Sequence, residues 1–476
     1  MSNRPRLRLV VLSGSLLVCS ALSAKDGWTQ ENSDQKLDQQ FQSAVAQYRA
    51  GKFAAASTQL ESLLPHVPKS FEVHELLGLT YAAQSQYEKA IEQLEIATRL
   101  KPDSAAARTN LATALAGTGK LELAEAQFRK ALALEPRDFD ANHNLAEFYL
   151  QANRMSEALP LLEQAQRINP SSYNNGYDLA LAYFLVGRRS DARQLIQTIM
   201  QQKNTGELHN LLGQIEEKNG KFLEAANEFQ VAAQMDPSED NLFTWGSELL
   251  LHRTYEPAID VFQQATKRYP TSPRLLIGLG MALYSRGRYD ESIKSLLSAA
   301  DLDPTDPRCY LFLSKSYLSS PNHADDVIQK FRRYSELQPN NALAQYYYAV
   351  SLWKGRRLED TSVDYRTVES LLQKSIALDG TLADAHLQLG ILYADQHESA
   401  KSLPEYQRAL ELNPNLPDAH YRLGQYYARA GQKDQAQKEF TSYQQLQAQH
   451  MAAVDKERAE VQQFVYSAKP ASVNKP

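Results

Sequence analysis

The chain has 476 residues, of which 43% are hydrophobic and 22% charged, and its formal net charge is −5. This acidic balance argues against nucleic-acid binding, which needs a basic face to displace counterions, and against adsorption to an anionic membrane surface. Of the two cysteines, Cys19 lies in the N-terminal apolar run described next. We therefore interpret Cys309 as a small buried residue rather than a reactive thiol.

The first 24 residues have the pattern of an export signal. Arg4, Arg6 and Arg8 form a basic start, and an apolar run covers residues 9–21. This run is shorter than the ~20 residues needed to cross a bilayer. Small residues at 21 and 23 place the expected cleavage after Ser23 or Ala24. We therefore expect an exported protein, periplasmic or secreted, with no membrane span after cleavage.

Two alternatives to cleavage stay open. The segment can be retained as an uncleaved anchor, or the chain can be anchored as a lipoprotein through Cys19. We favour cleavage over lipid attachment because Val18 precedes the cysteine, where a lipoprotein signal usually has a small residue. Residues 25–36 are polar (KDGWTQENSDQK), and we expect them to form a flexible lead-in.

Residues 37–450 consist of one unit of about 34 residues, repeated about twelve times. Places are numbered within each copy, so that Phe71 occupies place 1 and Gly78 place 8 of the clearest copy, which ends at Ser104. Place 8 is Gly, Ala or Ser in all twelve copies, and nine copies close with proline. These prolines are Pro68, Pro102, Pro136, Pro170, Pro237, Pro270, Pro304, Pro339 and Pro414.

Each feature of the unit has a physical reason. Apolar residues at places 4, 7 and 11 share one face of a first helix, and places 20, 24 and 27 share one face of a second helix. A small residue at place 8 allows the two helices to approach closely. Proline ends the second helix, because it lacks an N–H and disfavours helix in the residue before it. The unit is therefore predicted to be a helix-turn-helix.

This pattern resembles the tetratricopeptide repeat, whose signature has Leu-Gly, Tyr, Ala, Phe, Ala and Pro at corresponding places. The resemblance covers roughly residues 37–450. It implies an all-α fold, an α-solenoid of about twelve helix pairs that form a right-handed superhelix with a concave groove. It also implies a function in holding a partner, without saying which partner.

Some segments depart from the repeat. An insertion near residues 355–365 separates the two expected helices of the tenth copy. The last second helix is predicted to continue over residues 434–466 as a capping helix that shields the final copy. Residues 467–476 are expected to be disordered.

No catalytic pattern is present in the sequence. It contains no GxxxxGKS loop, no HExxH and no GxSxG. His386 and His420 lie 34 residues apart at place 4, which permits a metal pair, but His74 and His209 hold the same place, so we favour a packing role. We therefore expect neither enzyme activity nor a cofactor or metal.

The inner face of the expected solenoid is the candidate binding site, formed by places 2, 5, 6, 9, 12 and 13 of each first helix. At place 6 three consecutive copies carry Asn110, Asn144 and Asp178. This row resembles the asparagine ladder in the repeat domain of O-linked N-acetylglucosamine transferase, which grips the backbone of an extended peptide. An amide can donate and accept hydrogen bonds at once. The same wall is predicted to include Thr113, His143, Glu147 and Tyr177. The alternative is that these Asn, Asp and Glu residues only solvate an exposed helix face.

A second candidate wall is aromatic. Tyr346, Tyr347 and Tyr421 fall at inner-face places and are predicted to contact a protein segment or to stack on a glycan. Thickened packing between repeats is the alternative role for these tyrosines.

The sequence thus predicts a non-catalytic scaffold that binds an extended peptide or protein segment in its groove outside the cytoplasm. The alternative is an accessory subunit of an envelope complex for polysaccharide synthesis or export, secretion or outer-membrane assembly. That alternative rests on family analogy.

Overall fold

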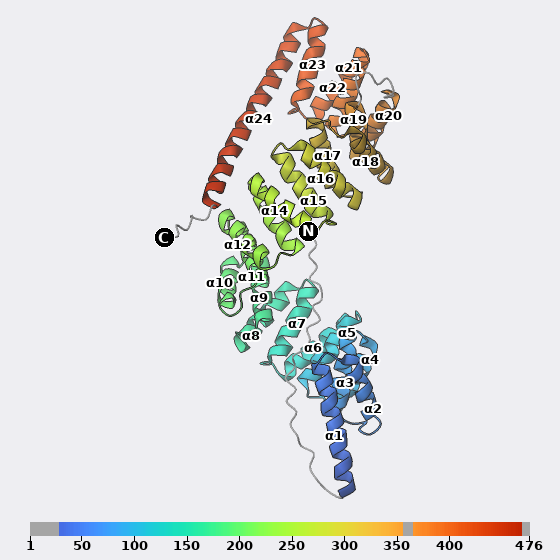
Figure 1. Ribbon diagram of the computed structural model, residues 1–476, viewed down its shortest axis with the longest axis vertical. Coiled ribbons are helices and arrows are strands. Elements are labelled where there is room, and N and C mark those ends of the chain that lie inside the picture. Colours follow the sequence, from blue (N-terminus) through green and yellow to red (C-terminus); the bar gives the residue numbers. More distant parts are fainter. Residues whose placement is uncertain (1–27, 356–364, 469–476) are drawn as a thin grey trace. The chain divides into compact units, whose positions relative to one another are not determined.

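The computed structural model describes residues 28–355 and 365–468, and the side chains of residues 35–355 and 365–451. Within these ranges the chain forms twenty-four α-helices and no β-strand (Figure 1). The all-α repeat fold with twelve helix pairs is therefore confirmed. The chain divides into two compact units, Met1–Asn204 and Thr205–Pro476, which are called unit 1 and unit 2 and are described separately.

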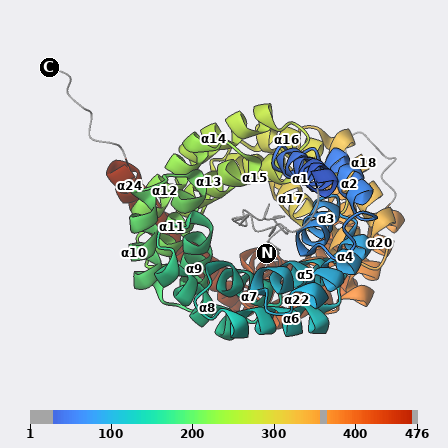
Figure 2. The same cartoon turned by 90° about the horizontal axis from the view of Figure 1, so that it is seen from below.

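Unit 1 contains five helix pairs. The two helices of a pair pack together, and the second helix also contacts the first helix of the next pair. Within this unit the first helices lie on the inner side of the curve and the second helices on the outer side (Figure 2). The helices are α1 (Trp28–Arg49), α2 (Phe53–Leu63), α3 (Phe71–Ala83), α4 (Tyr87–Leu100), α5 (Ala105–Gly117), α6 (Leu121–Leu134), α7 (Phe139–Gln151), α8 (Met155–Ile168), α9 (Tyr173–Leu185) and α10 (Arg189–Met200).

Unit 2 contains the remaining seven pairs, stacked in the same way. Its helices are α11 (Gly206–Lys218), α12 (Phe222–Met235), α13 (Glu239–Leu251), α14 (Tyr255–Arg268), α15 (Pro273–Ser285), α16 (Tyr289–Leu302), α17 (Pro307–Ser319), α18 (Ala324–Leu337), α19 (Ala342–Gly355), α20 (Tyr365–Leu378), α21 (Ala383–Asp395), α22 (Ser399–Leu412), α23 (Pro417–Arg429) and α24 (Lys433–Ala468).

The two helices of a pair approach closely because place 8 is small. At Gly78 an added Cβ atom would lie 2.5 Å from Cγ of Leu94 and 3.3 Å from the backbone oxygen of Ala90. At Gly213 it would lie 2.6 Å from Cε1 of Phe229. A larger residue would have to displace a buried partner in a tightly packed interior, so the role predicted for place 8 is confirmed.

Polar caps and proline set the ends of the helices. The side chain of Ser104 accepts a hydrogen bond from the backbone N–H of Ala107 on α5 at 3.1 Å. The side chain of Asp138 likewise accepts one from the backbone N–H of Ala141 on α7 at 2.7 Å. These side chains satisfy donors that the first turn leaves unpaired. Helix α4 ends at Leu100, two residues before Pro102, as the sequence predicts.

In every helix pair whose inner turn the structure describes, that turn contains one residue with a positive φ. Gly119 provides it with φ +76° and Gly187 with φ +83°, whereas Ser85 and His397 adopt φ near +60° with a side chain present. Glycine has no Cβ to clash in this conformation, so the non-glycine turns carry a conformational cost.

Apolar side chains form a continuous core between the helices of each unit. In unit 2 the ring of Phe262 is fully buried. It lies between Gly246 and Gly278, where an added Cβ atom would stand 2.8 and 2.6 Å from ring atoms. Cys309 is also fully buried, and its thiol donates to the backbone oxygen of Leu296 at 3.1 Å. Burial raises the pKa of this thiol to about 12, so the prediction of a small buried residue is confirmed.

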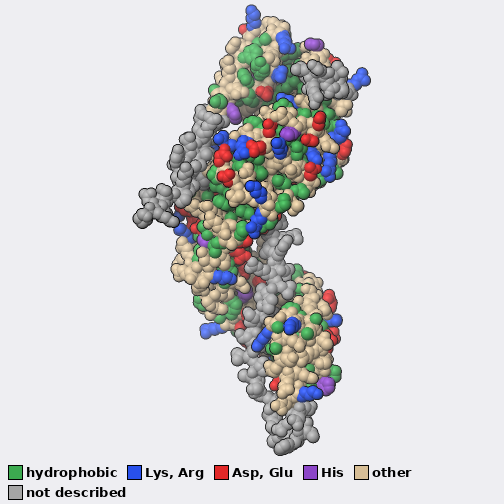
Figure 3. Space-filling view, in the orientation of Figure 1, with side chains coloured by type: hydrophobic (Ala, Val, Ile, Leu, Met, Phe, Trp, Pro, Cys, Tyr) green, Lys and Arg blue, Asp and Glu red, His purple; other side chains and the backbone are tan. Residues whose placement is uncertain are grey.

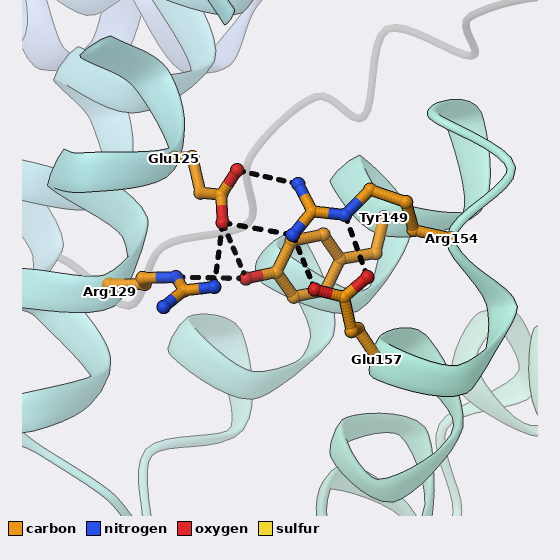
Figure 4. A network of polar contacts seen from close by, with 5 residues as sticks. All are labelled: Glu125, Arg129, Tyr149, Arg154 and Glu157. Atoms are coloured by element: carbon orange, nitrogen blue, oxygen red, sulfur yellow. Dashed lines mark hydrogen bonds and ion pairs between the residues drawn. The ribbon is translucent and has the colours of Figure 1, made fainter. Parts of the chain in front are cut away.

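A polar network joins α6, α7 and α8 in unit 1 (Figure 4). Arg154 Nη1 donates to Glu125 Oε2 at 2.6 Å, and Arg154 also pairs with Glu157. The hydroxyl of Tyr149 donates to Glu125 Oε1 and accepts from Arg129 Nε, both at 3.1 Å. The guanidinium of Arg154 lies 4.4 Å from the Tyr149 ring centroid, a cation–π contact. Three successive helices are therefore tied together by one cluster.

Several surface charges of unit 2 form ion pairs. On the face shown in Figure 3, acidic and basic side chains lie intermixed over helices α14 to α17. Arg286 Nε lies 2.5 Å from Glu256 Oε1, Arg288 pairs with Glu291 at 2.7 Å, and Lys330 pairs with an aspartate of α16. Exposed pairs of this kind contribute little stability each.

The boundaries differ from the sequence predictions at one end. Helix α1 begins at Trp28, so the polar segment 25–36 is helical from Trp28 onward rather than a flexible lead-in. The Gln, Glu, Asp and Lys residues of this segment are tolerated in a helix. The first helix of the first repeat therefore extends back through them to Trp28. Helix α24 reaches Ala468 and includes the segment 434–466 that was predicted to continue the last helix. It also includes residues 467 and 468, which were assigned to the disordered tail.

Three predicted segments lie wholly or mostly outside the described residues. They are the signal at 1–24, most of the insertion near 355–365, and the tail from residue 469. Among the described helices, none has both the length and the apolar character that a membrane crossing requires.

Candidate functional site

The inner face of unit 1 is built by successive first helices. Asn110 lies on α5, Asn144 on α7 and Asp178 on α9, each at place 6 of its copy. Helix α3 contacts α5, and α5 contacts α7. These helices line the inner side of the unit (Figure 2). We call this surface, from α3 to α9, the inner wall.

Asn144 is the most deeply placed amide of the predicted row. Only 8% of the residue is exposed, and among the described side chains its amide has no hydrogen-bond partner. The fully buried side-chain atoms without a hydrogen-bond partner do not include the amide atoms of Asn144. Solvent therefore reaches this amide. Water can solvate this amide in the free protein, and a ligand that offers both a donor and an acceptor would replace that water.

Asn110 is engaged by a carboxylate from the preceding repeat. Its Nδ2 donates to Glu75 Oε1 on α3 at 3.3 Å. Burial raises the pKa of Glu75 to about 7, and repulsion from Glu72 acts in the same direction, while Asn110 and the attraction of Lys101 oppose it. Glu75 was not among the predicted site residues. Its position at place 5, an inner-face place, is the sequence feature that identifies it.

His143 is fixed in the wall and is not free to act as a base. Its Nδ1 lies 3.2 Å from Oδ1 of Asn175, and its ring stacks on Phe139 with centroids 5.4 Å apart. Asn175 is fully buried and donates to Gln166 Oε1 at 2.8 Å. Burial lowers the pKa of His143, so the ring is neutral at pH 7 and serves to position α7 against α9.

The other predicted wall residues border the amide row. Glu147 is half-buried and accepts from Nε2 of Gln151 at 3.3 Å, and burial raises its pKa. Thr113 is exposed, with its hydroxyl donating to a backbone oxygen of its own helix at 3.0 Å. The ring of Tyr177 stacks on that of Tyr173 with centroids 6.5 Å apart. Asp178 is partly buried on the same helix.

The structure does not form the predicted aromatic wall. Tyr346 and Tyr347 are 8% and 6% exposed and belong to the core of unit 2. Tyr347 packs against Phe331 at 5.6 Å between ring centroids. Tyr421 is exposed, but its ring packs against that of Tyr443 on α24, with ring centroids 5.2 Å apart. These tyrosines are not brought together on one open surface, because the large rings at places 5 and 6 fill the space between neighbouring repeats.

The histidines at place 4 bond within their own repeats. His386 and His420 each present Nδ1 to a glutamate of the following helix, Glu405 and Glu439, at 2.6 Å. His420 Nε2 also lies 2.9 Å from the backbone oxygen of Pro414. No group of metal-ligating side chains occurs among the described residues. The histidine at place 4 of the first helix therefore bonds to the second helix of its repeat. His420 also bonds to the turn that precedes its repeat.

The inner wall can thus offer hydrogen bonds and negative charge to a ligand. Among its described side chains, an exposed threonine hydroxyl, unpaired amide atoms and half-buried carboxylates are the groups that face a ligand. These groups suit recognition of a polypeptide backbone and of cationic side chains.

Comparisons with known proteins agree with the repeat architecture. A model described as tetratricopeptide repeat matches residues 41–105, 76–132, 109–173 and 243–307, and two further models with this description match 152–215 and 405–438. Together these matches cover more than half of the chain, which belongs to the tetratricopeptide repeat family. Proteins of this family are generally non-catalytic scaffolds that bind protein or peptide partners.

Individual relatives are distant. The chain is 24% identical over 173 residues to the Small glutamine-rich tetratricopeptide repeat-containing protein 2 of Saccharomyces cerevisiae. This match covers 36% of the chain and 45% of the yeast protein, so the chain spans less than half the length of that relative.

Three solved structures match the chain at low sequence identity and low TM-score. The APC/C hetero-tetramer Cut9-Hcn1 matches with a TM-score of 0.40 and 14% identity, over 88% of this chain and 95% of that chain. Naa15/Naa10 bound to HypK-THB matches with a TM-score of 0.32 and 17% identity, over 86% and 68%. MamA matches with a TM-score of 0.28 and 23% identity, over 37% and 97%.

Proposed function

We propose that this protein is a non-catalytic scaffold whose inner wall in unit 1 binds an extended segment of another protein. The observation that carries the proposal is the amide of Asn144, more than nine-tenths buried and without a partner among the described side chains. Asn110 holds the same place one repeat earlier. Two amides in register along a curved wall match the backbone groups of an extended peptide, which alternate donors and acceptors.

The binding test uses the full mature chain and a random library of soluble dodecapeptides, with bound peptides identified by mass spectrometry. Wild-type protein is expected to enrich a subset of peptides, and Asn144→Ala is expected to weaken their binding by about tenfold, the effect of one lost hydrogen-bonded pair. Asn227→Ala, an exposed amide on outer helix α12, is the matched control and is expected to bind as wild type. Equal enrichment by wild type and Asn144→Ala would contradict the proposal.

We also propose that the protein acts outside the cytoplasm. The support is the basic start at Arg4, Arg6 and Arg8 followed by the apolar run at residues 9–21. Intact-mass measurement of the protein from its native cells is expected to give a mature chain that starts at Ala24 or Lys25. A chain that retains its first 23 residues, or carries a lipid on Cys19, would contradict signal cleavage. A glycan partner is not proposed, because Tyr346 and Tyr347 are buried.

A further inference from the structure

We propose that the segment held by the inner wall of unit 1 is basic, and that its lysine or arginine side chains pair with carboxylates of this wall. This inference rests on the proposed function and adds the chemistry of the partner. It concerns Glu75 on α3 and Asp140 and Glu147 on α7.

The first argument is the placement of the carboxylates on α7. Asp140, Asn144 and Glu147 are spaced i, i+4 and i+7, which puts them on one face of the helix. The unpartnered amide therefore has a carboxylate about one turn away on either side. A peptide backbone that reaches this amide would bring its own side chains beside both carboxylates.

The second argument is that neither Glu75 nor Glu147 forms an ion pair with a described side chain, although Lys101 attracts the Glu75 carboxylate from beyond ion-pair distance. Glu75 accepts from the amide of Asn110, and Glu147 accepts from the amide of Gln151. Among the described side chains, neither forms an ion pair with lysine or arginine. Glutamates on the outer side of the same unit do, since Glu125 pairs with Arg154 at 2.6 Å and Glu163 with Arg188 at 2.8 Å. Some outer carboxylates of this unit are thus paired within the fold, whereas Glu75 and Glu147 are not.

The third argument is the raised pKa of Glu75 and Glu147. Burial raises the pKa of both Glu75 and Glu147, because the charged form is poorly solvated there. A cation placed beside such a carboxylate stabilises its charged form and replaces the lost solvation. An anionic partner, such as a nucleic acid or an acidic peptide, would meet repulsion at the same place.

The spacing of the wall also predicts the spacing of basic residues. Adjacent packed helices lie roughly 8–10 Å apart, so Glu75 on α3 and Glu147 on α7 are separated by two such steps, roughly 20 Å. An extended chain advances ~3.3 Å per residue. Two basic residues about six positions apart would therefore reach both carboxylates.

The experiment measures binding of fluorescein-labelled Gly/Ser peptides to the full mature chain by fluorescence anisotropy. One peptide carries two lysines about six residues apart, and its partners carry glutamines or glutamates at the same positions. The proteins are wild type, Glu75→Gln, Glu147→Gln and Asn144→Ala. Glu95→Gln, which removes an exposed carboxylate from outer helix α4, is the matched control. Circular dichroism verifies that each variant is folded.

The lysine peptide is expected to bind wild type about tenfold tighter than the glutamine peptide, and the glutamate peptide to bind more weakly than both. Glu75→Gln and Glu147→Gln are each expected to reduce lysine-peptide affinity by about three- to tenfold and to leave the glutamine peptide unchanged, while Glu95→Gln changes neither. Raising the salt from about 50 mM to about 300 mM is expected to weaken only the lysine peptide. Asn144→Ala is expected to weaken both peptides.

Equal affinity for the lysine and glutamine peptides, with Asn144→Ala still weakening both, would overturn the basic partner and leave the peptide-binding function standing. Identical behaviour of Glu147→Gln and Glu95→Gln toward the lysine peptide would overturn the role of the wall carboxylates. Failure of all three peptides and of the random library to bind would overturn the proposed function itself, and this inference with it.

Discussion

Inner-face charges of the two units differ in their partners. In unit 1 the carboxylates of Glu75 and Glu147 accept hydrogen bonds from amides and form no ion pair among the described side chains. In unit 2 two inner-face arginines are paired within the fold: Arg274 Nε lies 2.9 Å from a carboxylate oxygen of Glu239, and Arg308 Nη2 lies 2.6 Å from one of Asp306. The same repeat therefore yields inner-face charges that are paired within the fold and others that are not. Capacity for a ligand depends on the groups that the repeat leaves unmatched.

Aromatic residues show a related difference. In unit 1 the inner places of α7 carry short or charged side chains, and the amide of Asn144 keeps contact with solvent. In unit 2 the corresponding places of α19 carry Tyr346 and Tyr347, whose rings fill the core. Large rings at inner places therefore close the surface that smaller polar residues leave open.

The largest expected effect tests whether the two units act separately. Phe262→Ala empties a fully buried site in unit 2 and is expected to cost about 3–5 kcal/mol of local stability, measured by hydrogen exchange over α13–α16. Because repeats couple mainly to their neighbours, lysine-peptide binding by unit 1 is expected to persist. Phe128→Ala, at the same place in unit 1, is expected to weaken stability and binding together. Loss of peptide binding in Phe262→Ala would contradict a site confined to unit 1.

The second prediction concerns pH. The pKa of Glu75 is raised to about 7, so its carboxyl is mostly neutral near pH 6 and mostly charged near pH 8. Affinity for the lysine peptide is therefore expected to rise about three- to tenfold from about pH 6 to about pH 8. Glu75→Gln is expected to flatten this rise, and Glu95→Gln to retain it. If the rise in affinity persists unchanged in Glu75→Gln, a titratable group other than Glu75 causes it.

The third prediction addresses the outer network of unit 1. Arg154→Met keeps the apolar stem but removes the guanidinium, and is expected to lower the free energy of unfolding only slightly, because solvent screens these ion pairs; urea denaturation measures the change. The hydrogen bond from Arg154 lowers the pKa of Glu125. This contribution is therefore present above the unfolded carboxyl pKa of about 4.3 and is lost as pH falls through the folded value. Arg137→Met, which removes an exposed arginine from a loop, is the control.

The smallest effect compares turns in the two units. His397 in unit 2 holds φ +60° and is exposed, so His397→Gly is expected to stabilise the protein by about 0.5–1 kcal/mol. Gly119 in unit 1 holds φ +76°, and Gly119→Ala is expected to destabilise by a similar amount. Thermal denaturation measures both changes. A lower melting temperature for His397→Gly would mean that its side chain makes a stabilising contact.

The sequence predicted the repeat from local physics. Small residues at place 8, such as Gly78, and closing prolines, such as Pro102, specify helix pairs wherever they occur, because close approach and helix termination depend on the residue itself. Segment ends were less predictable. Helix α1 begins at Trp28 because polar residues adjoining a repeat can continue its first helix.

The candidate site was predicted only in part. The inner places predict that Asn110 and Asn144 share one wall, since periodicity fixes which side of a helix a residue occupies. The same rule placed Tyr346 and Tyr347 on the inner face, but both are buried. Periodicity does not show whether a neighbouring repeat covers that face.

The sequence by itself thus determined the family, the number of helix pairs and the helix face on which each residue lies, because these depend on residue type and spacing along one chain. Only the tertiary structure decided which inner-face groups are satisfied. Glu75 accepts a hydrogen bond from Asn110, 35 residues later in the chain, while Asn144 makes no hydrogen bond with a described side chain. Contacts between repeats depend on the side chains of two copies at once, so the spacing within one copy does not fix them.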